Sequence, residues 1–232
     1  MNVALRTVNL SKYFGSGSEK IQVLDSINLE IMAGQLTMLV GPSGCGKTTL
    51  ISILTGILSP TAGQVFIGQT ELTKLRDVEK VLFRREKIGF VFQQFNLLSS
   101  LTAEENAAVS LVAKGMSLKR AVAYANELLE KLGMHEHAKK FPNQLSGGQQ
   151  QRIAFARALL HKPKIMVCDE PTASLDTISG KQVMEFLVQV AQSADSAVIV
   201  VTHDSRIFHF ADNICYMNDG KVEKQERNNK KV

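Results

Sequence analysis

The sequence predicts an α/β fold in which a mostly parallel sheet is interrupted by a helical insertion. Three runs, "LTMLV", "IMVCD" and "AVIVV", are apolar without a break, which is typical of parallel strands buried on both faces. From about residue 102 to residue 160 the pattern is mostly helical, and strand and helix patterns alternate again after it. Such alternation favours a sheet covered by helices, with the helical segment inserted into it.

Each expected element rests on its local pattern. Alternating or continuous apolar residues indicate strands, in chain order, at 4–10, 23–31, 36–40, 64–68, 88–92, 165–170, 197–203 and 213–222. Apolar residues at helical spacing indicate helices over 46–58 and 119–134, after the stretch "LSGGQ", and over 179–192. Ser146 is a natural N-cap for the third of these helices, and Pro163 ends it.

Length and composition indicate a globular protein with a sizeable core. The chain has 232 residues, 44% of them hydrophobic and 21% charged, which suits one large domain or two tightly joined ones. No apolar run reaches the roughly 18 residues of a membrane span. Arg6, Asn9 and Lys12 stand where a signal peptide needs an apolar stretch. We therefore expect a cytosolic protein with its three cysteines reduced.

The net charge of +5 raises the question of an acidic partner. Much of this charge lies in the last segment, "KVEKQERNNKKV", after the last apolar residues of the expected fold. We interpret residues 222–232 as a basic, solvated tail in preference to a binding arm. We therefore expect no nucleic-acid partner.

A phosphate-binding loop is predicted at "GPSGCGKTT". The stretch fits the pattern G-x-x-x-x-G-K-[ST] and stands between an apolar strand and an apolar helix, as the motif requires. Its glycines let successive N–H groups face an anion, and the helix N-terminus adds roughly half a positive charge. Lys47 should reach the β- and γ-phosphates, and the Thr48 hydroxyl should bind Mg²⁺. The expected nucleotide-binding residues are Gly41, Pro42, Ser43, Gly44, Cys45, Gly46, Lys47, Thr48 and Thr49.

Polar residues follow three other apolar runs. Asp169 and Glu170 end "IMVCDE", Gln93 follows "IGFVF", and His203 follows "AVIVVT". A carboxylate at the C-terminal end of a parallel strand lies where such sheets bind ligands, so Asp169 should hold Mg²⁺, directly or through water. Glu170 is placed to polarise an attacking water. A lone histidine at a strand end is usually structural, but we expect the strand ends of Asp169–Glu170 and His203 to converge on one γ-phosphate, which favours a catalytic His203.

A second glycine turn opens the helix after Ser146. Gly147 and Gly148 lie just inside this helix, with Gln149 in its first turn. The turn is another anion-facing helix terminus, but it has no lysine and no metal-binding acid beside it. On its own it would bind a γ-phosphate weakly, so we interpret it as the lid of another subunit's site.

These segments together resemble the ATP-binding cassette (ABC) family over essentially the whole chain. "GPSGCGKTT" looks like its Walker A motif, "IMVCDE" like its Walker B motif, and "LSGGQ" like its signature sequence. "SLD", at residues 174–176, looks like its D-loop. Gln93 is similar to its Q-loop glutamine, and His203 to its switch histidine. P-loops are widespread, but the complete set in this order is highly specific.

The resemblance implies one nucleotide-binding domain over residues 1–232. Its P-loop NTPase core would carry a mostly parallel sheet, an N-terminal antiparallel β subdomain, and a helical signature subdomain at about 94–160. It further implies an ATPase that uses ATP and Mg²⁺ in a head-to-tail dimer, in which each ATP lies between one Walker A motif and the partner's signature. The implied catalytic residues are Lys47, Gln93, Glu170 and His203; Gln93 is also an implied Mg²⁺ ligand, and Ser146, Gly147, Gly148, Gln149 and Asp176 are implied nucleotide contacts.

The family also implies an aromatic residue stacked on adenine near the N-terminus. "SKYFG" offers Tyr13 and Phe14. The family aromatic usually ends this segment, so Phe14 is preferred, although either ring could serve in core packing. Stacking would contribute roughly 1 kcal/mol, by analogy with aromatic pairs.

A finer resemblance lies in "KIGFVFQQFNLLSSLTAEENAAVSL". It is similar to cassettes for lipoprotein release, macrolide export, cell division and heterocyst glycolipid export, although "PTASLD" stands where lipoprotein-release members tend to have "PTGNLD". The subgroup implies an exporter subunit at the cytoplasmic face of the inner membrane, driving a separate membrane permease and, through it, a periplasmic adaptor. The alternative is a cell-division cassette that transmits force without moving cargo.

Two other classes share some of these motifs. A small-molecule P-loop kinase would have "GPSGCGKTT" but no reason for "LSGGQ" followed by "DEP". A cassette acting on DNA or ribosomes usually carries coiled coils, zinc modules or a second cassette, whereas this chain has one compact cassette.

The segment after Gln93 has two interpretations. Its apolar residues (Phe95, Leu97, Leu98 and Leu101) either pack the helical insertion or line a groove that accepts a helix of the membrane protein. A charge reversal at Glu104 or Glu105 that uncoupled transport without harming ATPase activity would favour the groove.

Overall fold

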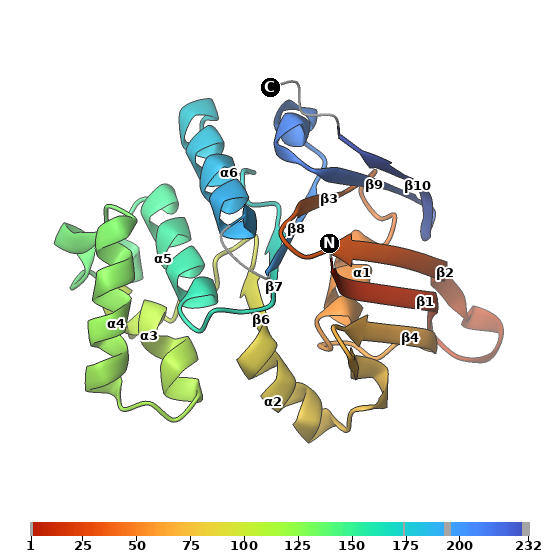
Figure 1. The fold of residues 1–232 in the computed structure, drawn as a ribbon, viewed down its shortest axis with the longest axis horizontal. Coiled ribbons are helices and arrows are strands. Elements are labelled where there is room, and N and C mark those ends of the chain that lie inside the picture. Colours follow the sequence, from red (N-terminus) through yellow and green to blue (C-terminus); the bar gives the residue numbers. More distant parts are fainter. Residues whose placement is uncertain (1, 174, 193–195, 229–232) are drawn as a thin grey trace.

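The computed structural model describes residues 2–173, 175–192 and 196–228, which form two sheets and a helical segment (Figure 1). The first sheet is antiparallel and has the strand order β2-β1-β4-β5, with β1 at Val3–Phe14, β2 at Ile21–Met32, β4 at Ala62–Ile67 and β5 at Thr70–Glu71. The second has the order β10-β9-β3-β8-β7-β6, with β3 at Leu36–Val40, β6 at Ile88–Val91, β7 at Ile165–Asp169, β8 at Ala197–Thr202, β9 at Asn213–Asn218 and β10 at Lys221–Arg227. Its strands are parallel except β10.

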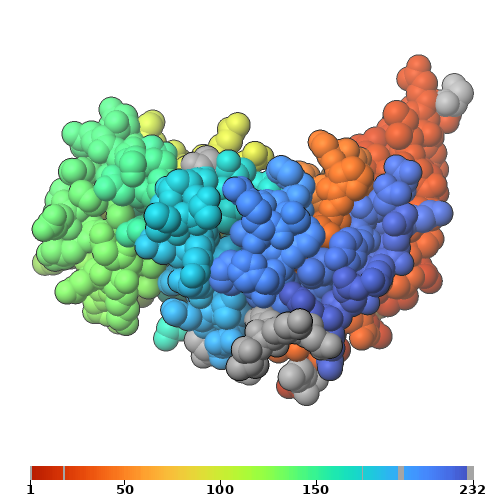
Figure 2. Space-filling model, turned by 90° about the horizontal axis from the view of Figure 1, so that it is seen from above, coloured from red at the N-terminus to blue at the C-terminus, as the bar shows by residue number. Residues whose placement is uncertain are grey.

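Helices cover the second sheet and build the segment inserted after β6. They are α1 (Lys47–Leu54), α2 (Asp77–Lys87), α3 (Ala103–Ala113), α4 (Leu118–Lys131), α5 (Gly147–Leu159) and α6 (Thr177–Gln192). Seen from above, the helical segment lies at one end of the molecule and the antiparallel sheet at the other (Figure 2). The predicted fold class, with its mostly parallel sheet, antiparallel N-terminal sheet and helical segment, is confirmed. Within the described ranges, no helix combines the length and the apolar character that crossing a membrane requires.

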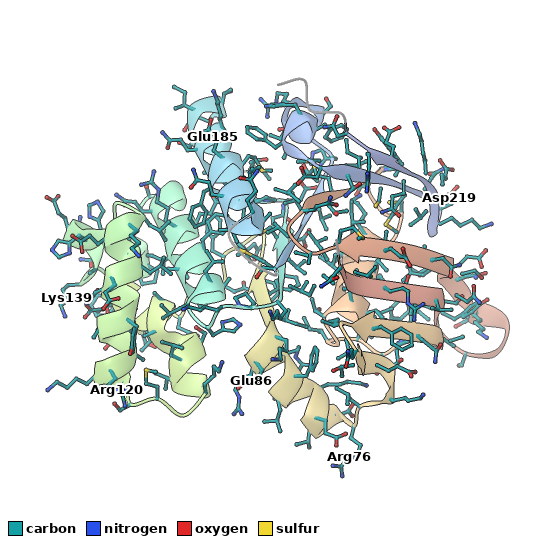
Figure 3. All side chains as sticks on the ribbon, in the orientation of Figure 1. Arg76, Glu86, Arg120, Lys139, Glu185 and Asp219 are labelled. Atoms are coloured by element: carbon teal, nitrogen blue, oxygen red, sulfur yellow. The ribbon has the colours of Figure 1, made fainter. Side chains whose placement is uncertain are left out.

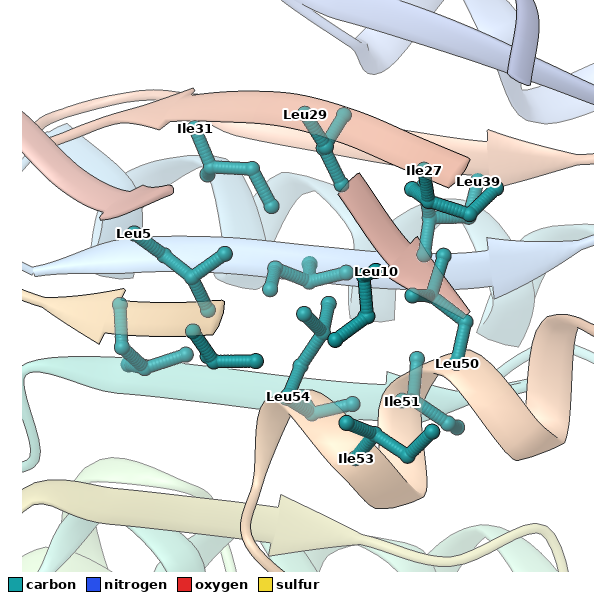
Figure 4. Close-up of a cluster of buried hydrophobic side chains, with 14 of the residues drawn as sticks. Leu5, Leu10, Ile27, Leu29, Ile31, Leu39, Leu50, Ile51, Ile53 and Leu54 are labelled. Carbon is teal, nitrogen blue, oxygen red and sulfur yellow. The ribbon is translucent and has the colours of Figure 1, made fainter. Parts of the chain in front are cut away.

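Helix α1 is held between the two sheets by its apolar side chains (Figure 4). Leu50, Ile51, Ile53 and Leu54 are each at most 1% exposed and belong to one cluster with residues of β1, β2 and β3. Each such burial stabilises the fold by roughly 1.5–3 kcal/mol. The N-terminus of α1, where the phosphate loop ends, is therefore fixed relative to both sheets.

Helix α5 joins the helical segment to the second sheet. Phe155 and Ala158 pack in the cluster that contains Val91 of β6. Ile153 and Ala156, on the other face, pack with the helical segment. Helix α5 thus contributes to two cores, and its position depends on the packing of both the sheet and the helical segment.

Helix α2 was not predicted. None of its side chains is fully buried. Phe83 packs against the core, but the other apolar residues, Val78, Val81 and Leu82, are exposed, so the sequence shows no continuous apolar stripe facing a core. The helix begins instead with an N-terminal hydrogen bond, in which the Arg76 N–H donates to the Glu79 carboxylate at 2.8 Å.

The predicted C-terminal tail is wrong for residues 222–227, which belong to β10. This strand pairs with β9, from Lys221 opposite Asn218 to Arg227 opposite Asn213. Most of its side chains are exposed, so backbone hydrogen bonds rather than apolar side chains hold it, and its sequence resembles a solvated tail. Residues 229–232 lie outside the described residues.

Candidate nucleotide-binding site

Four neighbouring parallel strands end at the same edge of the second sheet. Their order is β3-β8-β7-β6, and each carries a predicted site residue at or just after its carboxyl end. These ends open into a cleft of about 630 Å³ lined by Val23, Pro42, Ser43, Gly44, Gly46, Lys47, Thr48, Thr49, Gln93, Asp169, Glu170, Val201 and His203. The volume lies in the range of small-molecule sites. The phosphate loop, both acids, the glutamine and the histidine are thus brought together, while Gly41 and Cys45 belong to the same loop behind its lining.

The phosphate loop holds Lys47 against its own backbone. The Lys47 ammonium donates to the carbonyls of Gly41 and Pro42, at 2.8 Å each. Gly46 is the N-cap of α1, with φ of 99°, a left-handed conformation that favours glycine. The loop therefore places a cation and a helix N-terminus at one end of the cleft, which suits a polyphosphate.

The turn between β9 and β10 supports this loop from behind, which the motif did not predict. The Gly220 N–H donates to the Cys45 carbonyl at 3.1 Å, and the Gly220 carbonyl accepts from the Asp25 N–H at 2.9 Å. A Cβ on Gly220 would lie 2.5 Å from the Val23 carbonyl oxygen. The turn stretch "NDG" was a signal for a hairpin, but nothing in the sequence indicated that it would meet the phosphate loop.

A methyl group at Gly46 should disturb the site from within the loop. A Cβ there would lie 2.8 Å from the Val23 carbonyl oxygen and would carry the left-handed φ, so Gly46→Ala should cost about 1–3 kcal/mol of stability and weaken nucleotide binding. Gly34→Ala is the matched control, because Gly34 has φ of 79° but open space around its Cβ position. Thermal unfolding and titration of a fluorescent nucleotide measure both effects. Equal loss of nucleotide affinity in both variants would contradict the predicted role of this contact.

Glu170 is held in a conformation unusual for its type. Its φ is 47°, in the left-handed region, and its N–H donates to the Val201 carbonyl at 2.9 Å. Its Oε1 lies 2.7 Å from His203 Nδ1. The Glu170 side chain is 14% exposed and the His203 side chain 71% exposed. Strained backbone that surrounding hydrogen bonds maintain is typical of functional sites.

Asp169 lies in an environment that disfavours its charge. Burial raises the pKa of this carboxyl, the neighbouring Glu170 raises it further, and Lys47 opposes both effects. A cation in the cleft would offset the cost of the buried charge. Asp169 shares the cleft with the Thr48 hydroxyl and the Gln93 amide. One carboxylate with neutral oxygen donors and substrate phosphates is the ligand set that Mg²⁺ takes, so these residues fit that ion.

The signature residues lie outside this cleft. Ser146 and Gly147 are exposed, and Ser146 is the N-cap of α5 in a reciprocal capping box with Gln149. The Ser146 N–H donates to Gln149 Oε1 at 2.9 Å, and the Gln149 N–H donates to Ser146 Oγ at 3.3 Å. Gly148 would place a Cβ 3.9 Å from Leu175. These residues therefore form a capped, exposed helix terminus that does not line the cleft of its own chain.

Two other predicted nucleotide contacts also lie outside the residues that line the cleft. Asp176 caps the start of α6, accepting from the N–H groups of Ile178 and Ser179 at 2.9 and 3.0 Å, and these bonds to Ser179 hold the pKa of its carboxyl below the usual value. Ser174, the first residue of "SLD", lies outside the described residues. Phe14 is 43% exposed at the end of β1, with Lys12 Nζ 5.0 Å from its ring centroid. The Tyr13 ring faces Lys20 Nζ at 4.2 Å.

Comparison with known proteins identifies relatives along nearly the whole chain. The profile of the family described as "ABC transporter" matches residues 24–173. The chain is 41% identical over 227 residues to an uncharacterized ABC transporter ATP-binding protein, MJ0796, of Methanocaldococcus jannaschii, covering 96% of this chain and 97% of that one. It is 39% identical over 214 residues to the uncharacterized ABC transporter ATP-binding protein Rv0986 of Mycobacterium tuberculosis, covering 92% and 86%.

Solved structures agree with this assignment. The dimeric post-hydrolysis structure of the MJ0796 cassette, bound to ADP and Pi, superposes with a TM-score of 0.89 at 40% identity and covers 96% of this chain and 98% of that one. The cbiO1 subunit of Clostridium perfringens, part of the ABC transporter complex cbiONQ, gives 0.85 at 28% identity, covering 98% and 89%. The chain therefore belongs to the ABC transporter family and is an ATPase of that family.

Proposed function

We propose that this ATPase works as a head-to-tail dimer around two ATP molecules with Mg²⁺ and drives a separate membrane permease. The observation that carries the proposal is the separation of two anion-binding termini within one chain. The phosphate loop opens into the cleft, whereas the Ser146 turn is exposed outside it. A second copy would bring the turn of one chain over the cleft of the other. The similar MJ0796 cassette has dimeric structures, which supports an assembly of two copies.

The residues of the cleft have different roles in the transfer of the phosphoryl group to water. Lys47 and the N-terminus of α1 bind the phosphates, and their charge stabilises the transition state electrostatically. Thr48, Asp169 and Gln93 would hold Mg²⁺, which neutralises charge on the phosphates. Glu170 orients water and accepts its proton. His203 fixes the Glu170 carboxylate through Nδ1, and its other ring nitrogen remains for the γ-phosphoryl group.

A test of this proposal is whether ATP changes the mass of the protein in solution. ATP with Mg²⁺ should convert the chain to a dimer in analytical ultracentrifugation, and ADP should return it to a monomer, because hydrolysis removes the γ-phosphate that both copies bind. A monomer at every nucleotide concentration, with full ATPase activity, would refute the sandwich.

The permease would dock on an apolar surface of the helical segment. A groove of about 440 Å³ runs between α3, α4 and the end of α5, lined by Leu111, Met116, Tyr124, Glu127, Leu128, Lys131, Leu159, Leu160 and Lys162. Phe95 and Leu97, by contrast, pack against the cores, whereas Leu98 of the same segment is 49% exposed. An exposed apolar groove with charged residues at its margin suits an amphipathic helix. The subgroup resemblance supports a permease that exports its cargo, at the cytoplasmic face of the inner membrane.

Tyr124 offers a direct test of the docking surface. Tyr124→Glu should abolish co-purification with the membrane fraction and leave the ATPase activity of the isolated protein unchanged, because Tyr124 is 46% exposed and distant in the fold from the cleft residues. Leu118→Glu is the control, since Leu118 is 50% exposed on the same helix but does not line the groove. Loss of membrane association in both variants would count against this groove.

Charge reversal at Glu104 tests the fold instead of coupling. Glu104 is 4% exposed. Its carboxylate forms an ion pair with Lys139 (labelled in Figure 3) and accepts a hydrogen bond from the Asn126 amide at 2.8 Å. The Lys139 side chain is 83% exposed, so the cost of Glu104→Lys should come mainly from the Asn126 amide, which loses its acceptor, and should be about 1–3 kcal/mol. Glu130→Lys, at an exposed position of α4, should change stability little. Thermal unfolding distinguishes them, and an equal Tm for both variants would contradict a structural role of the buried Glu104 carboxylate.

A further inference from the structure

The loop that carries Gln93 has two consecutive residues in left-handed conformation. Phe95 has φ of 59° and Asn96 has φ of 46°. This conformation is unfavourable for Phe95, which has a bulky side chain, whereas asparagine adopts it more readily. The loop must therefore be stabilised from outside, or it would relax and move Gln93, two residues before Phe95.

Arg157 of α5 provides that stabilisation. One guanidinium nitrogen donates to the Asn96 carbonyl and another to the Phe95 carbonyl, both at 2.6 Å. The side chain is half-buried, and burial lowers its pKa. Among the described residues, no carboxylate forms an ion pair with Arg157. Its guanidinium instead donates to the two loop carbonyls. A planar guanidinium fixes two acceptors in one geometry, which an ammonium group cannot do.

Helix α5, which carries Arg157, packs against β6, the strand that precedes the loop. A Cβ on Gly89 of β6 would lie 2.4 Å from the Ala158 carbonyl oxygen, so α5 and β6 are in close contact. One turn after Arg157, His161 Nε2 lies 3.1 Å from the Ile88 carbonyl at the start of β6. Helix α5 thus contacts the strand at its beginning, and Arg157 contacts the loop beyond its end.

We infer that Arg157 is a positioning residue for ATP hydrolysis: its guanidinium holds the Phe95–Asn96 backbone so that Gln93 stays at the cleft. This inference rests on the proposed role of Gln93 as a Mg²⁺ ligand. Arg157 is not among the residues that line the cleft. It acts through the loop, and its loss should weaken Mg²⁺ binding with little change in binding of nucleotide without metal.

The test compares nucleotide affinity with Mg²⁺ and with EDTA. A fluorescent ATP analogue is titrated into wild type, Arg157→Lys, Gln93→Ala and the double variant. In wild type, Mg²⁺ should raise the affinity for the nucleotide. In Arg157→Lys this increase should be roughly tenfold smaller, as expected when a residue that orients a metal ligand is lost. The double variant should be no worse than Gln93→Ala. Affinity in EDTA should be equal in all four proteins, which also shows that each is folded.

Arg152→Lys is the matched control, because Arg152 lies on the same helix and donates to the Leu132 carbonyl, away from the loop. If Arg157→Lys fails to fold, Asn96→Val is the second variant that disturbs the loop. Asn96 is exposed, and a β-branched residue does not tolerate the positive φ of Asn96. The expected Mg²⁺ defect is the same. A wild-type Mg²⁺ dependence in the folded Arg157 or Asn96 variants, or an additive double variant, would overturn the inference. No Mg²⁺ dependence in wild type, or none lost in Gln93→Ala, would overturn the proposed role of Gln93 and the inference with it.

Discussion

Glu170→Gln should lower ATP turnover by at least about a hundredfold and leave a stable ATP-bound dimer, because a general base contributes typically 10²–10⁴-fold. The amide cannot accept a proton from water, but it matches the carboxylate in size and can still accept from His203 Nδ1. The backbone hydrogen bond to Val201 does not involve the side chain. Phosphate binding by Lys47 and the helix terminus should persist, so ATP is bound without being consumed.

Two measurements together decide this prediction. Phosphate release gives turnover, and ultracentrifugation with ATP gives the mass of the variant. Glu185→Gln is a matched control at an exposed carboxylate on α6 (Figure 3), where the ion pair with Lys181 is solvent-exposed and should be worth little. A Glu170→Gln protein that stayed monomeric with ATP would exclude the proposed dimer, and one that kept its turnover would exclude Glu170 as the base.

Most of the cleft could be predicted from the sequence, because most of its functional residues follow the carboxyl ends of parallel strands. Lys47, Gln93, Asp169 and His203 follow apolar runs, and the carboxyl ends of parallel strands meet at one edge of a sheet. The pattern of each run was sufficient, without knowledge of strand order. The same rule cannot place residues that reach the site from other elements.

The residues that sequence reasoning missed act through backbone atoms. Gly220 supports the phosphate loop through the Cys45 carbonyl, and Arg157 supports the Gln93 loop through two carbonyls. Backbone acceptors are present at every residue, so such contacts leave no signature in side-chain types. Asp176 differs from these two residues, because its nucleotide contact was implied by the family resemblance; in this structure its oxygens accept from the first turn of α6.

Leucines at Gly147 and Gly148 should abolish turnover without harming the fold. A Cβ on Gly147 would meet no atom within 4 Å, and one on Gly148 would reach only ordinary contact with Leu175. Because both glycines lie in the first turn of α5, replacing them should stabilise the helix by less than the roughly 1 kcal/mol typical of a helix interior. Neither glycine lines the chain's own cleft, so the monomer should still bind ATP. In the dimer, the bulky side chains should prevent the partner's nucleotide from contacting the turn.

Mixing this variant with Lys47→Ala separates a site within one chain from a site shared by two. The glycine variant keeps an intact cleft, and the Lys47 variant keeps an intact Ser146 turn. In a head-to-tail heterodimer one of the two shared sites is therefore complete. Random pairing makes half of the dimers heterodimers, so an equal mixture should regain about a quarter of wild-type turnover, although each component alone is inactive. A mixture as inactive as its components would contradict the shared site, because then neither chain completes the other's cleft.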